Sequence, residues 1–307
     1  MPEVSVIMPT YNRAHLVGRA IQSVLNQTFQ DFEIIVINNY SKDKTIDVID
    51  SFNDKRIKLI NFRNNGIIAK SRNQGLMKSA GDYIAFLDDD DIWEPEKLEK
   101  QIEVLRNAPE AVGAVYTGMI LLDKQGRIIK KVIPKYRGNI FYLLLTKSYI
   151  DSASALVVKK ECFEHVGFFD ESGDLGVGDD WDMWIRIAQH YEFNFVPEVL
   201  VKIYFHGKNI TTNTALTIKR HKAITAKYEK YITASPRKIR AAHYRYGGII
   251  LWRSGDIKGG KKFFIKSIFA NPLTIFDILC FISLDTSSKF LNRIRRMKKT
   301  LLRWILD

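Results

Sequence analysis

The first half of the chain alternates short apolar runs with segments whose apolar residues recur at helical spacing. The apolar runs are rich in Val, Ile and Phe, which is typical of strands buried on both faces of a parallel sheet. These predicted strands are Val4–Met8, Glu33–Ile37, Arg56–Phe62 and Tyr83–Leu87. The helical pattern covers Leu16–Leu25, Ile46–Ile49, Ile68–Lys78 and Pro95–Asn107. This alternation predicts an α/β fold with a mostly parallel sheet and right-handed crossovers.

After Ala111 the pattern changes, because two apolar runs are joined by a turn-forming segment. Val112–Leu122 and Arg127–Ile133 flank the sequence Asp-Lys-Gln-Gly and are expected to form a hairpin. Further predicted elements are a strand at Ser154–Lys159, a helix at Trp181–His190, and strands at Phe193–Pro197 and Val199–Phe205. Hairpin strands are antiparallel, so the sheet is expected to be mixed.

Beyond Thr214 the sequence is helical in pattern and strongly basic. From Thr211 to Asp307 there are 21 Lys and Arg against 5 Asp and Glu, a balance of +16, which leaves −3 of the total +13 for residues 1–210. We therefore expect two regions, a domain at residues 1–212 and a basic helical region at 213–307. An apolar stripe that begins at Phe290 and ends near Ile305 predicts a helix that binds an anionic membrane surface, or alternatively docks on the domain at residues 1–212 or on a partner.

Composition narrows the setting of the protein. Two cysteines, Cys162 and Cys280, are too few for a disulfide framework. The sequence shows no secretion signal and no apolar run of about 18 residues, so we expect a cytoplasmic protein, held peripherally at the inner face of the cell membrane by its basic region. The basic half contains no recognisable nucleic-acid-binding motif, and no nucleic-acid partner is predicted.

The segment Gly81–Asp91, with the sequence GDYIAFLDDDD, carries the clearest chemical signal. A buried strand runs directly into four carboxylates, at the strand end where α/β sheets bind ligands. Four adjacent carboxylates repel one another unless a cation or a network of hydrogen-bond donors offsets the repulsion, and a hard divalent cation with oxygen ligands fits such a site. The alternative is a solvated acidic turn in which Asp91 caps the next helix.

Polar and aromatic side chains also follow the first two predicted strands. Tyr11 and Arg13 come after the first strand, where a tyrosine can stack on a base and an arginine can bind phosphate. Asn38 and Asn39 come after the second strand. No G-x-G-x-x-G motif follows the first strand, which disfavours dinucleotide binding.

From Val4 to about Thr212 the chain resembles the inverting glycosyltransferases of family 2, which have the GT-A fold. The matching motifs are Pro9-Thr10-Tyr11-Asn12-Arg13, Ser23-x-x-x-Gln27-Thr28, Asn64-x-Gly66 with Ser71-Arg72-Asn73, Gly81-Asp82-Tyr83 with Phe86 to Asp91, Val166 to Glu171, and Gly178-Asp179-Asp180-Trp181-Asp182. Each motif is modestly specific, but their order and spacing together are specific and cover about two thirds of the chain.

The resemblance implies a nucleoside-diphosphate sugar as donor, most simply a UDP-sugar, and a glycan or lipid-linked acceptor in the synthesis of cell-surface polysaccharide or glycoconjugate. Asp88–Asp90 resembles the family's D-x-D element, with Asp90 and Asp88 on Mn²⁺ or Mg²⁺ and Asp89 near the ribose or metal. Arg72 and Lys70 would face the diphosphate, and His206 is a further metal-ligand candidate. The acidic pair Asp179-Asp180 supplies donor contacts and the catalytic base, which we assign to Asp180. Donor-binding residues implied in this way are Pro9, Tyr11, Arg13, Asn38, Asn39, Arg72, Asp88, Asp89 and Asp179.

Two departures from the family pattern leave alternatives open. The family usually has two aspartates where this chain has Asn38-Asn39, and an arginine where it has Tyr204 before His206. An amide oxygen at Asn39 still accepts a hydrogen bond from a base, so donor binding is expected to survive. The alternatives are a non-catalytic nucleotide-sugar or glycan-binding module with a degenerate site and, ranked last, a nucleotidyltransferase.

Overall fold

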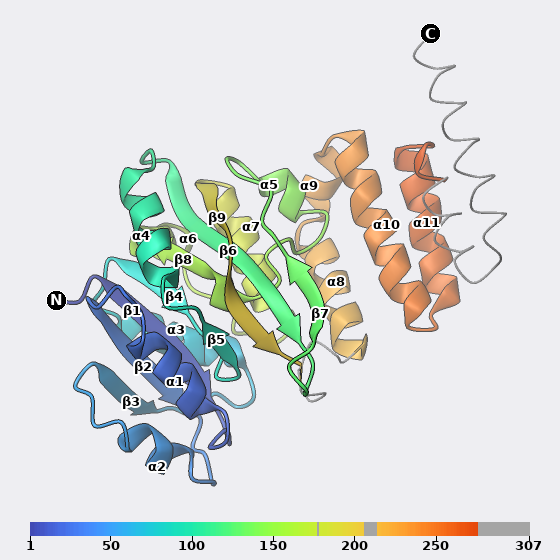
Figure 1. Cartoon of the computed structure of the whole chain (residues 1–307). Coiled ribbons are helices and arrows are strands. Elements are labelled where there is room, and N and C mark those ends of the chain that lie inside the picture. The colour runs from blue at the N-terminus through green and yellow to red at the C-terminus, as the bar shows by residue number, and fades with distance from the viewer. Residues whose placement is uncertain (177, 206–213, 276–307) are drawn as a thin grey trace. The chain divides into compact units, whose positions relative to one another are not determined.

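The computed structural model describes residues 1–176, 178–205 and 214–275 of the chain (Figure 1). These residues belong to two compact units. The first consists of Met1–Phe141 and Tyr149–Thr212, and the second of Tyr142–Ser148 and the described part of Asn213–Asp307. His206 and the apolar stripe from Phe290 to Ile305 lie outside the described residues.

The first unit is built on one mixed sheet. Its parallel part has the order β3-β2-β1-β4, from β1 Val4–Thr10, β2 Phe32–Asn38, β3 Ile57–Asn61 and β4 Tyr83–Phe86. Every residue of β1 and β2 is buried, as the continuous apolar runs predict for central parallel strands. The first four predicted strands are confirmed as strands, but β3 lies at the edge of the sheet and its residues are half-buried or exposed, so the burial expected of Arg56–Phe62 is wrong.

The other part of the sheet continues in the order β8-β6-β9-β5, with β8 Leu156–Lys159, β6 Val112–Leu122, β9 Glu192–Tyr204 and β5 Asp91–Trp93. β8 is antiparallel to both β4 and β6, and β9 is parallel to β6. β7 Ile128–Val132 pairs with β6 and forms the predicted hairpin. The sheet is therefore mixed, as the change of pattern after Ala111 indicates.

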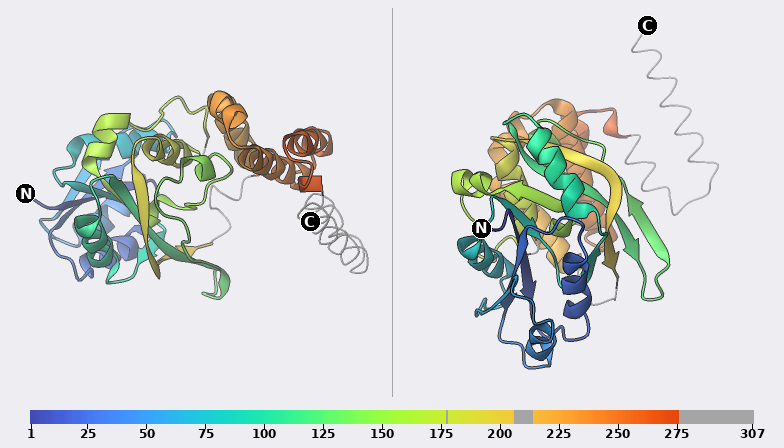
Figure 2. Two further views of the ribbon diagram at one scale, coloured as in Figure 1. Left: turned by 90° about the horizontal axis from the view of Figure 1, so that it is seen from above. Right: turned by 60° about the vertical axis from the view of Figure 1, so that its left-hand side comes forward.

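Helices cover both faces of this sheet (Figures 1 and 2). On one face, α1 Val17–Leu25 packs apolar side chains with alternate residues of β1 and β2, and α4 Lys97–Asn107 lies against β6 and β9. On the other face lie α3 Ile68–Lys78, α6 Lys160–Val166 and α7 Asp179–Ala188, and the ring of Phe86 packs 6.0 Å from Phe163 and 6.3 Å from Trp184. The short α2 Thr45–Asp50 precedes β3, and a 3₁₀ turn at Ala153–Ala155 precedes β8.

Three local predictions are corrected by the structure. The two strands predicted at 193–197 and 199–205 are one strand, because Pro197 and Glu198 form an irregularity between the pairs Thr117↔Val196 and Gly118↔Val199 instead of a turn. The helix predicted from Trp181 begins at Asp179, so both members of the acidic pair lie in its first turn. β5 and α6 were not predicted, because three and seven residues are too few to show a period.

The second unit is helical in its described part, as predicted for the basic region. Its helices are α8 Thr214–Lys227, α9 Glu229–Ala234, α10 Arg237–Arg253 and α11 Ile257–Ala270. Of the short helix α5 Phe141–Leu144, Phe141 is assigned to the first unit and the remaining residues to the second. Gly255, with φ of 88°, turns the chain between α10 and α11, and the Asp256 carboxylate caps α11 by accepting a hydrogen bond from the Gly259 N–H. Within the described residues, no helix has the length and apolar character needed to cross a membrane.

Candidate active site

The predicted site residues that the structure describes gather at one edge of the sheet, where the parallel strands β1, β2 and β4 end. Tyr11 and Arg13 follow β1, and Asn39 follows β2. Beyond β4 the chain makes a tight turn closed by a hydrogen bond of 3.0 Å from the Asp91 N–H to the carbonyl of Asp88. This acidic turn, Asp88–Asp91, therefore stands beside the loops that follow the other parallel strands.

Arg72 of α3 links the acidic turn to the start of α7. Its Nη1 lies 2.6 Å from Oδ2 of Asp179, and its Nη2 lies 3.4 Å from Oδ1 of Asp88. Burial lowers the pKa of the Arg72 guanidinium, but the carboxylates of Asp179, Asp88 and Asp180 outweigh burial and raise that pKa above its usual value. Arg72 is thus a permanent positive charge that holds two acidic segments together, although they are 91 residues apart in sequence.

Asp89 is held by residues at the end of β1. Thr10 donates its hydroxyl to Oδ2 of Asp89 at 2.6 Å, and Nε of Arg13 lies 3.4 Å from Oδ1. Burial is the main cause that raises the pKa of Asp89 to about 7, and the negative charge of Asp90 acts in the same direction. The hydrogen bond from Thr10 lowers this pKa but does not outweigh them. Thr10 and Arg13 therefore hold the Asp89 carboxylate beside the end of β1.

Asp91 differs from the three carboxylates that precede it. It is buried in β5, where its Oδ2 accepts hydrogen bonds from the hydroxyls of Ser154 at 2.6 Å and Ser152 at 3.3 Å. The Ser154 hydroxyl in turn accepts the N–H of Asp88 at 3.1 Å. Burial, together with Asp88 and Asp90, raises the pKa of Asp91 well above its usual value. Asp91 supports the acidic turn from inside the fold, and the alternative in which it caps the next helix is wrong.

The acidic turn has the donor chemistry that a divalent cation requires. Burial raises the pKa of Asp88, and repulsion from Asp90 and Asp179 adds to this effect while Arg72 opposes it. A bound cation relieves such repulsion, so the carboxylates of Asp88 and Asp90 fit Mn²⁺ or Mg²⁺. Among the residues that the structure describes, three or more metal-ligating side chains do not converge on one point. The third predicted ligand, His206, lies outside those residues.

The two asparagines after β2 have different environments. Asn38 is fully buried, donates its amide to Oδ1 of Asn61 at 2.6 Å, and accepts the hydroxyl of Ser41 at 2.6 Å. Oδ1 of Asn39 accepts the backbone N–H of Asn64 at 3.0 Å. An amide oxygen has a second lone pair, so Asn39 can accept one more hydrogen bond, whereas Asn38 is occupied with the loop itself.

Two exposed tyrosines stand at the same edge of the sheet. Tyr11 is 50% exposed and Tyr40 is 52% exposed. Tyr40 adopts a left-handed backbone conformation with φ of 54°, and the guanidinium of Arg63 lies 5.5 Å from the centre of its ring. Tyr11 is a predicted site residue, whereas Tyr40, which directly follows Asn38-Asn39, is not among the predicted site residues. Pro9, by contrast, is buried within β1.

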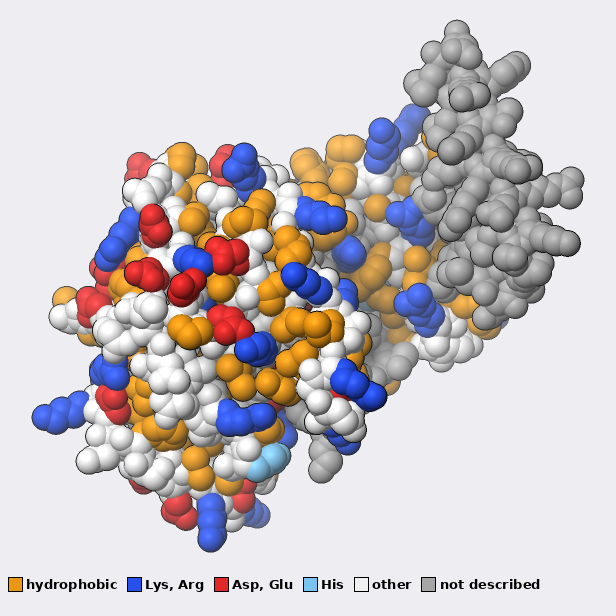
Figure 3. Space-filling view, in the orientation of Figure 1, with side chains coloured by type: hydrophobic (Ala, Val, Ile, Leu, Met, Phe, Trp, Pro, Cys, Tyr) orange, Lys and Arg blue, Asp and Glu red, His pale blue; other side chains and the backbone are white. Residues whose placement is uncertain are grey.

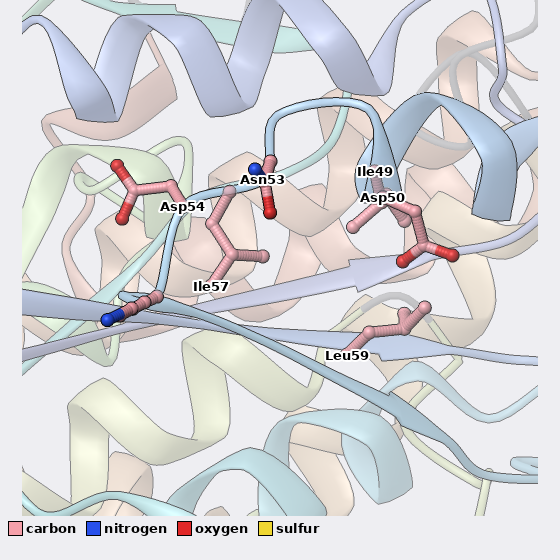
Figure 4. A pocket seen from close by; sticks show the side chains of 7 residues that line it. Ile49, Asp50, Asn53, Asp54, Ile57 and Leu59 are labelled. Atoms are coloured by element: carbon pink, nitrogen blue, oxygen red, sulfur yellow. The ribbon is translucent and has the colours of Figure 1, made fainter.

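The hollow shown in Figure 4 lies elsewhere in the first unit. It has a volume of about 240 Å³ and is bounded by the end of α2, the following loop and the first half of β3. Its lining residues are Ile49, Asp50, Asn53, Asp54, Lys55, Ile57 and Leu59. β3 begins at Ile57, so this hollow adjoins the amino end of the strand, away from the acidic turn.

Comparison with known proteins decides the family. Residues 5–167 match the family model described as Glycosyl transferase family 2. An uncharacterized glycosyltransferase of Rickettsia typhi is 35% identical over 220 residues, which cover 70% of this chain and 67% of that protein. The chain belongs to glycosyl transferase family 2. An uncharacterized glycosyltransferase of Methanocaldococcus jannaschii is 32% identical to this family 2 enzyme over 227 residues, which cover 72% of this chain and 76% of that protein.

Solved structures agree on the fold of this glycosyltransferase. Residues 1–349 of Staphylococcus aureus TarS, in complex with UDP-GlcNAc, align with a TM-score of 0.64 at 16% identity, covering 99% of this chain and 92% of that one. The mannosyltransferase PcManGT of Pyrobaculum calidifontis, in complex with GDP-Man and Mn²⁺, aligns with a TM-score of 0.60 at 18% identity, covering 98% and 80%. The family and the GT-A fold expected from the resemblance are confirmed.

Proposed function

We propose that this protein is an inverting, metal-assisted glycosyltransferase that moves a hexosyl or N-acetylhexosaminyl group from a UDP-sugar to a hydroxyl of a glycan or lipid-linked acceptor. The expected context is synthesis of cell-surface polysaccharide or glycoconjugate. The observation that carries the proposal is the Arg72 bridge, which joins Asp88 of the acidic turn to Asp179 at the start of α7. A donor-binding turn and a candidate base are thereby held at one site.

The acidic turn is the proposed diphosphate and metal site. Asp88 and Asp90 would hold Mn²⁺ or Mg²⁺, with His206 as the predicted third ligand, and a bound ion stabilises the charge that develops on the leaving nucleoside diphosphate. The complex of PcManGT with GDP-Man and Mn²⁺ supports the use of a divalent ion. Arg72 and Arg13 would add positive charge near the phosphates.

The nucleobase of the nucleoside-diphosphate sugar would bind between the loops that follow β1 and β2. Tyr11 exposes half of its side chain and is suited to stacking on the base. Asn39 retains an acceptor for a ring N–H of uracil. Asn38 and Pro9 are buried, so their proposed contribution is to shape these loops. The complex of TarS with UDP-GlcNAc supports a UDP-sugar as donor.

Asp180 is the proposed catalytic base. Its neighbour Asp179 is buried and committed to Arg72 at 2.6 Å, whereas Asp180 is only half-buried. The acceptor hydroxyl would give its proton to the Asp180 carboxylate while its oxygen forms a bond to the anomeric carbon. The bond from that carbon to the diphosphate breaks on the opposite face, and the nucleoside diphosphate leaves, so a single displacement inverts the anomeric centre.

The chain is proposed to act as two parts, a catalytic domain at residues 1–212 and a basic region at 213–307 that contacts the anionic inner face of the cell membrane. The charge balance of +16 after residue 210 supports this arrangement. Deletion of residues 286–307 is expected to move the protein from the membrane to the soluble fraction, and unchanged partitioning would remove this part of the proposal.

The proposal is tested with a panel of nucleoside-diphosphate sugars incubated with the protein, a membrane extract and Mn²⁺ or Mg²⁺. Released nucleoside diphosphate is measured for the wild type and for Asp180→Asn. Metal-dependent release that the variant lacks is the expected result. Donor binding without release would favour a binding module with a degenerate site at Asn38-Asn39, and release of pyrophosphate would indicate a nucleotidyltransferase.

A further inference from the structure

The β6–β7 hairpin projects from the sheet at the edge that carries the acidic turn (Figures 1 and 2). Ala85 of β4 and Val115 of β6 both pair with Val157, and β8 is antiparallel to each of them, so β4 and β6 run in the same direction. Asp88 lies three residues beyond Ala85, whereas β6 continues for seven residues beyond Val115 to Leu122. At about 3.3 Å per residue, the end of β6 stands roughly 13 Å beyond the start of the acidic turn.

The second strand of this hairpin and the residues around it are basic and apolar together. Residues 123–137 contain six basic side chains and one acidic side chain, Asp123. Three isoleucines are exposed among them, Ile128 at 66%, Ile129 at 54% and Ile133 at 38%. Basic and hydrophobic side chains are interspersed in Figure 3 in the area where Figure 1 draws β7. The basic residues are Lys124, Arg127, Lys130, Lys131, Lys135 and Arg137.

A β-bulge decides which of these side chains face outward. Val132 packs toward the hydrophobic core, so its neighbours Lys131 and Ile133 alternate onto the outer face. Regular alternation would also turn Ile128 inward. The register shift places the extra residue Ile129 between the cross-strand pairs, so Ile128 shares the outer face with Lys131 and Ile133. The side chains along the outer face are therefore apolar, basic and apolar in turn, from Ile128 through Lys131 to Ile133.

We propose that the β6–β7 hairpin is a membrane-contact surface that fits a bilayer containing anionic lipid. The lysines would lie at the anionic headgroups, and the isoleucines would enter the boundary between headgroups and acyl chains. Since the hairpin extends past the acidic turn at the same edge of the sheet, it would hold the site toward the bilayer. Delivery of a lipid-linked acceptor to that site rests on the proposed function.

Other occupants of this surface agree less well with its side chains. Pairing of β7 with β7 of a second copy would bring Lys130 and Lys131 against the same lysines, and like charges across a strand pair are destabilising. A soluble polyanion would use the lysines but leave the exposed isoleucines in water. The acidic residues that face the hairpin, Asp123 and Asp151, form exposed ion pairs with Arg127 at 2.6 Å and Lys130 at 3.3 Å, and they leave the surface net positive.

Vesicle co-sedimentation of the full chain tests the proposal, with vesicles of phosphatidylcholine alone and with added phosphatidylglycerol. Lys131→Gln is expected to lower the affinity for anionic vesicles about fivefold, because Lys131 lies on the outer face, whereas Lys130 alternates to the other face and pairs with Asp151. The matched control, Lys78→Gln, removes the same charge from an exposed position at the carboxyl end of α3, and is expected to change the affinity less than about twofold. Ile128→Ser with Ile133→Ser is expected to weaken binding that persists at high salt, by roughly tenfold or more.

Several results would overturn the proposal. The first is that the wild type does not bind anionic vesicles, and the second is that hairpin and control variants lose the same affinity for them. The third is that the hairpin variants lose binding to soluble polyphosphate while their vesicle binding is unchanged. Vesicle binding carried by residues 213–307 alone would leave the hairpin variants unchanged and would also overturn it. Thermal unfolding confirms that each variant is folded. Vesicle binding without any sugar transfer would count against the proposed function but not against this surface.

Discussion

Replacement of Arg72 by methionine is expected to destabilise the protein strongly. Methionine keeps much of the side-chain volume but removes the charge that lies between Asp179 and Asp88. The side chains of Arg72 and Asp179 are each only 6% exposed, and removing one partner of such a buried pair typically costs about 3–5 kcal/mol. The contact with Asp88 adds little, because it is 3.4 Å long and Asp88 is 33% exposed.

Chemical denaturation at pH 7 measures this loss, and the same experiment at lower pH tests its cause. As the carboxylates take up protons, the buried negative charge left by Arg72→Met disappears, so the deficit is expected to shrink. Arg72→Met combined with Asp179→Asn is expected to recover part of the stability at pH 7.

Arg13→Met is the matched control, because Arg13 is 26% exposed and lies 3.4 Å from Asp89. Its expected cost is about 1 kcal/mol or less. A loss for Arg72→Met that is no larger than the loss for this control, or that does not depend on pH, would refute the reasoning. If Arg72→Met does not fold, Arg72→Lys and the double variant with Asp179→Asn provide the comparison.

Three further predictions concern the same domain. The pKa of Asp89 is about 7 in the folded state and 3.8 when unperturbed, so the folded state binds this proton more tightly than the unfolded state does. Protonated Asp89 therefore stabilises the fold by about 4 kcal/mol, an effect that is complete below about pH 4 and is lost as pH rises through 7. Denaturation of metal-free protein should show this decline, and Asp89→Asn should reduce it; an unchanged pH profile would contradict the assignment. Gly81→Ala places a Cβ within 2.8 Å of β1 backbone atoms and should cost about 1–3 kcal/mol in thermal unfolding, unlike Gly18→Ala, which meets only a side chain at 3.2 Å. Lys97 is fully buried, and its amine lies 3.9 Å from the centre of the Trp93 ring but has no hydrogen-bond partner among the described residues, so Lys97→Met should stabilise by about 1–3 kcal/mol, and any loss of stability would disprove this.

The sequence predicts the parallel part of the fold well for a physical reason. Strands such as Val4–Thr10 are buried on both faces, so they appear as continuous apolar runs, and α3 has the bounds that its periodicity predicts. Irregular pairing is not visible in one strand alone. The bulge at Pro197 and Glu198 depends on Gly118 of the partner strand, where an added Cβ would lie 2.7 Å from the carbonyl oxygen of Glu198.

Much of the site was also predictable, because its motifs are contiguous in sequence. The acidic turn Asp88–Asp91 and the acidic pair Asp179-Asp180 are each visible as a run of carboxylates in the sequence. Their connection was not predictable, because the bridge through Arg72 arises only when α3, the turn after β4 and α7 meet in the folded domain. The support of Asp91 by Ser154 likewise joins residues that are 63 positions apart.

The most direct test of the proposed reaction separates donor binding from turnover in Asp180→Asn. Calorimetry gives the donor affinity in the presence of Mn²⁺, and release of nucleoside diphosphate in the presence of acceptor gives the rate. If Asp180 is the base, the variant should bind donor within about threefold of the wild type while its turnover falls by roughly 10²–10⁴. Turnover equal to the wild type with donor binding intact would contradict the assignment of Asp180 and the mechanism built on it.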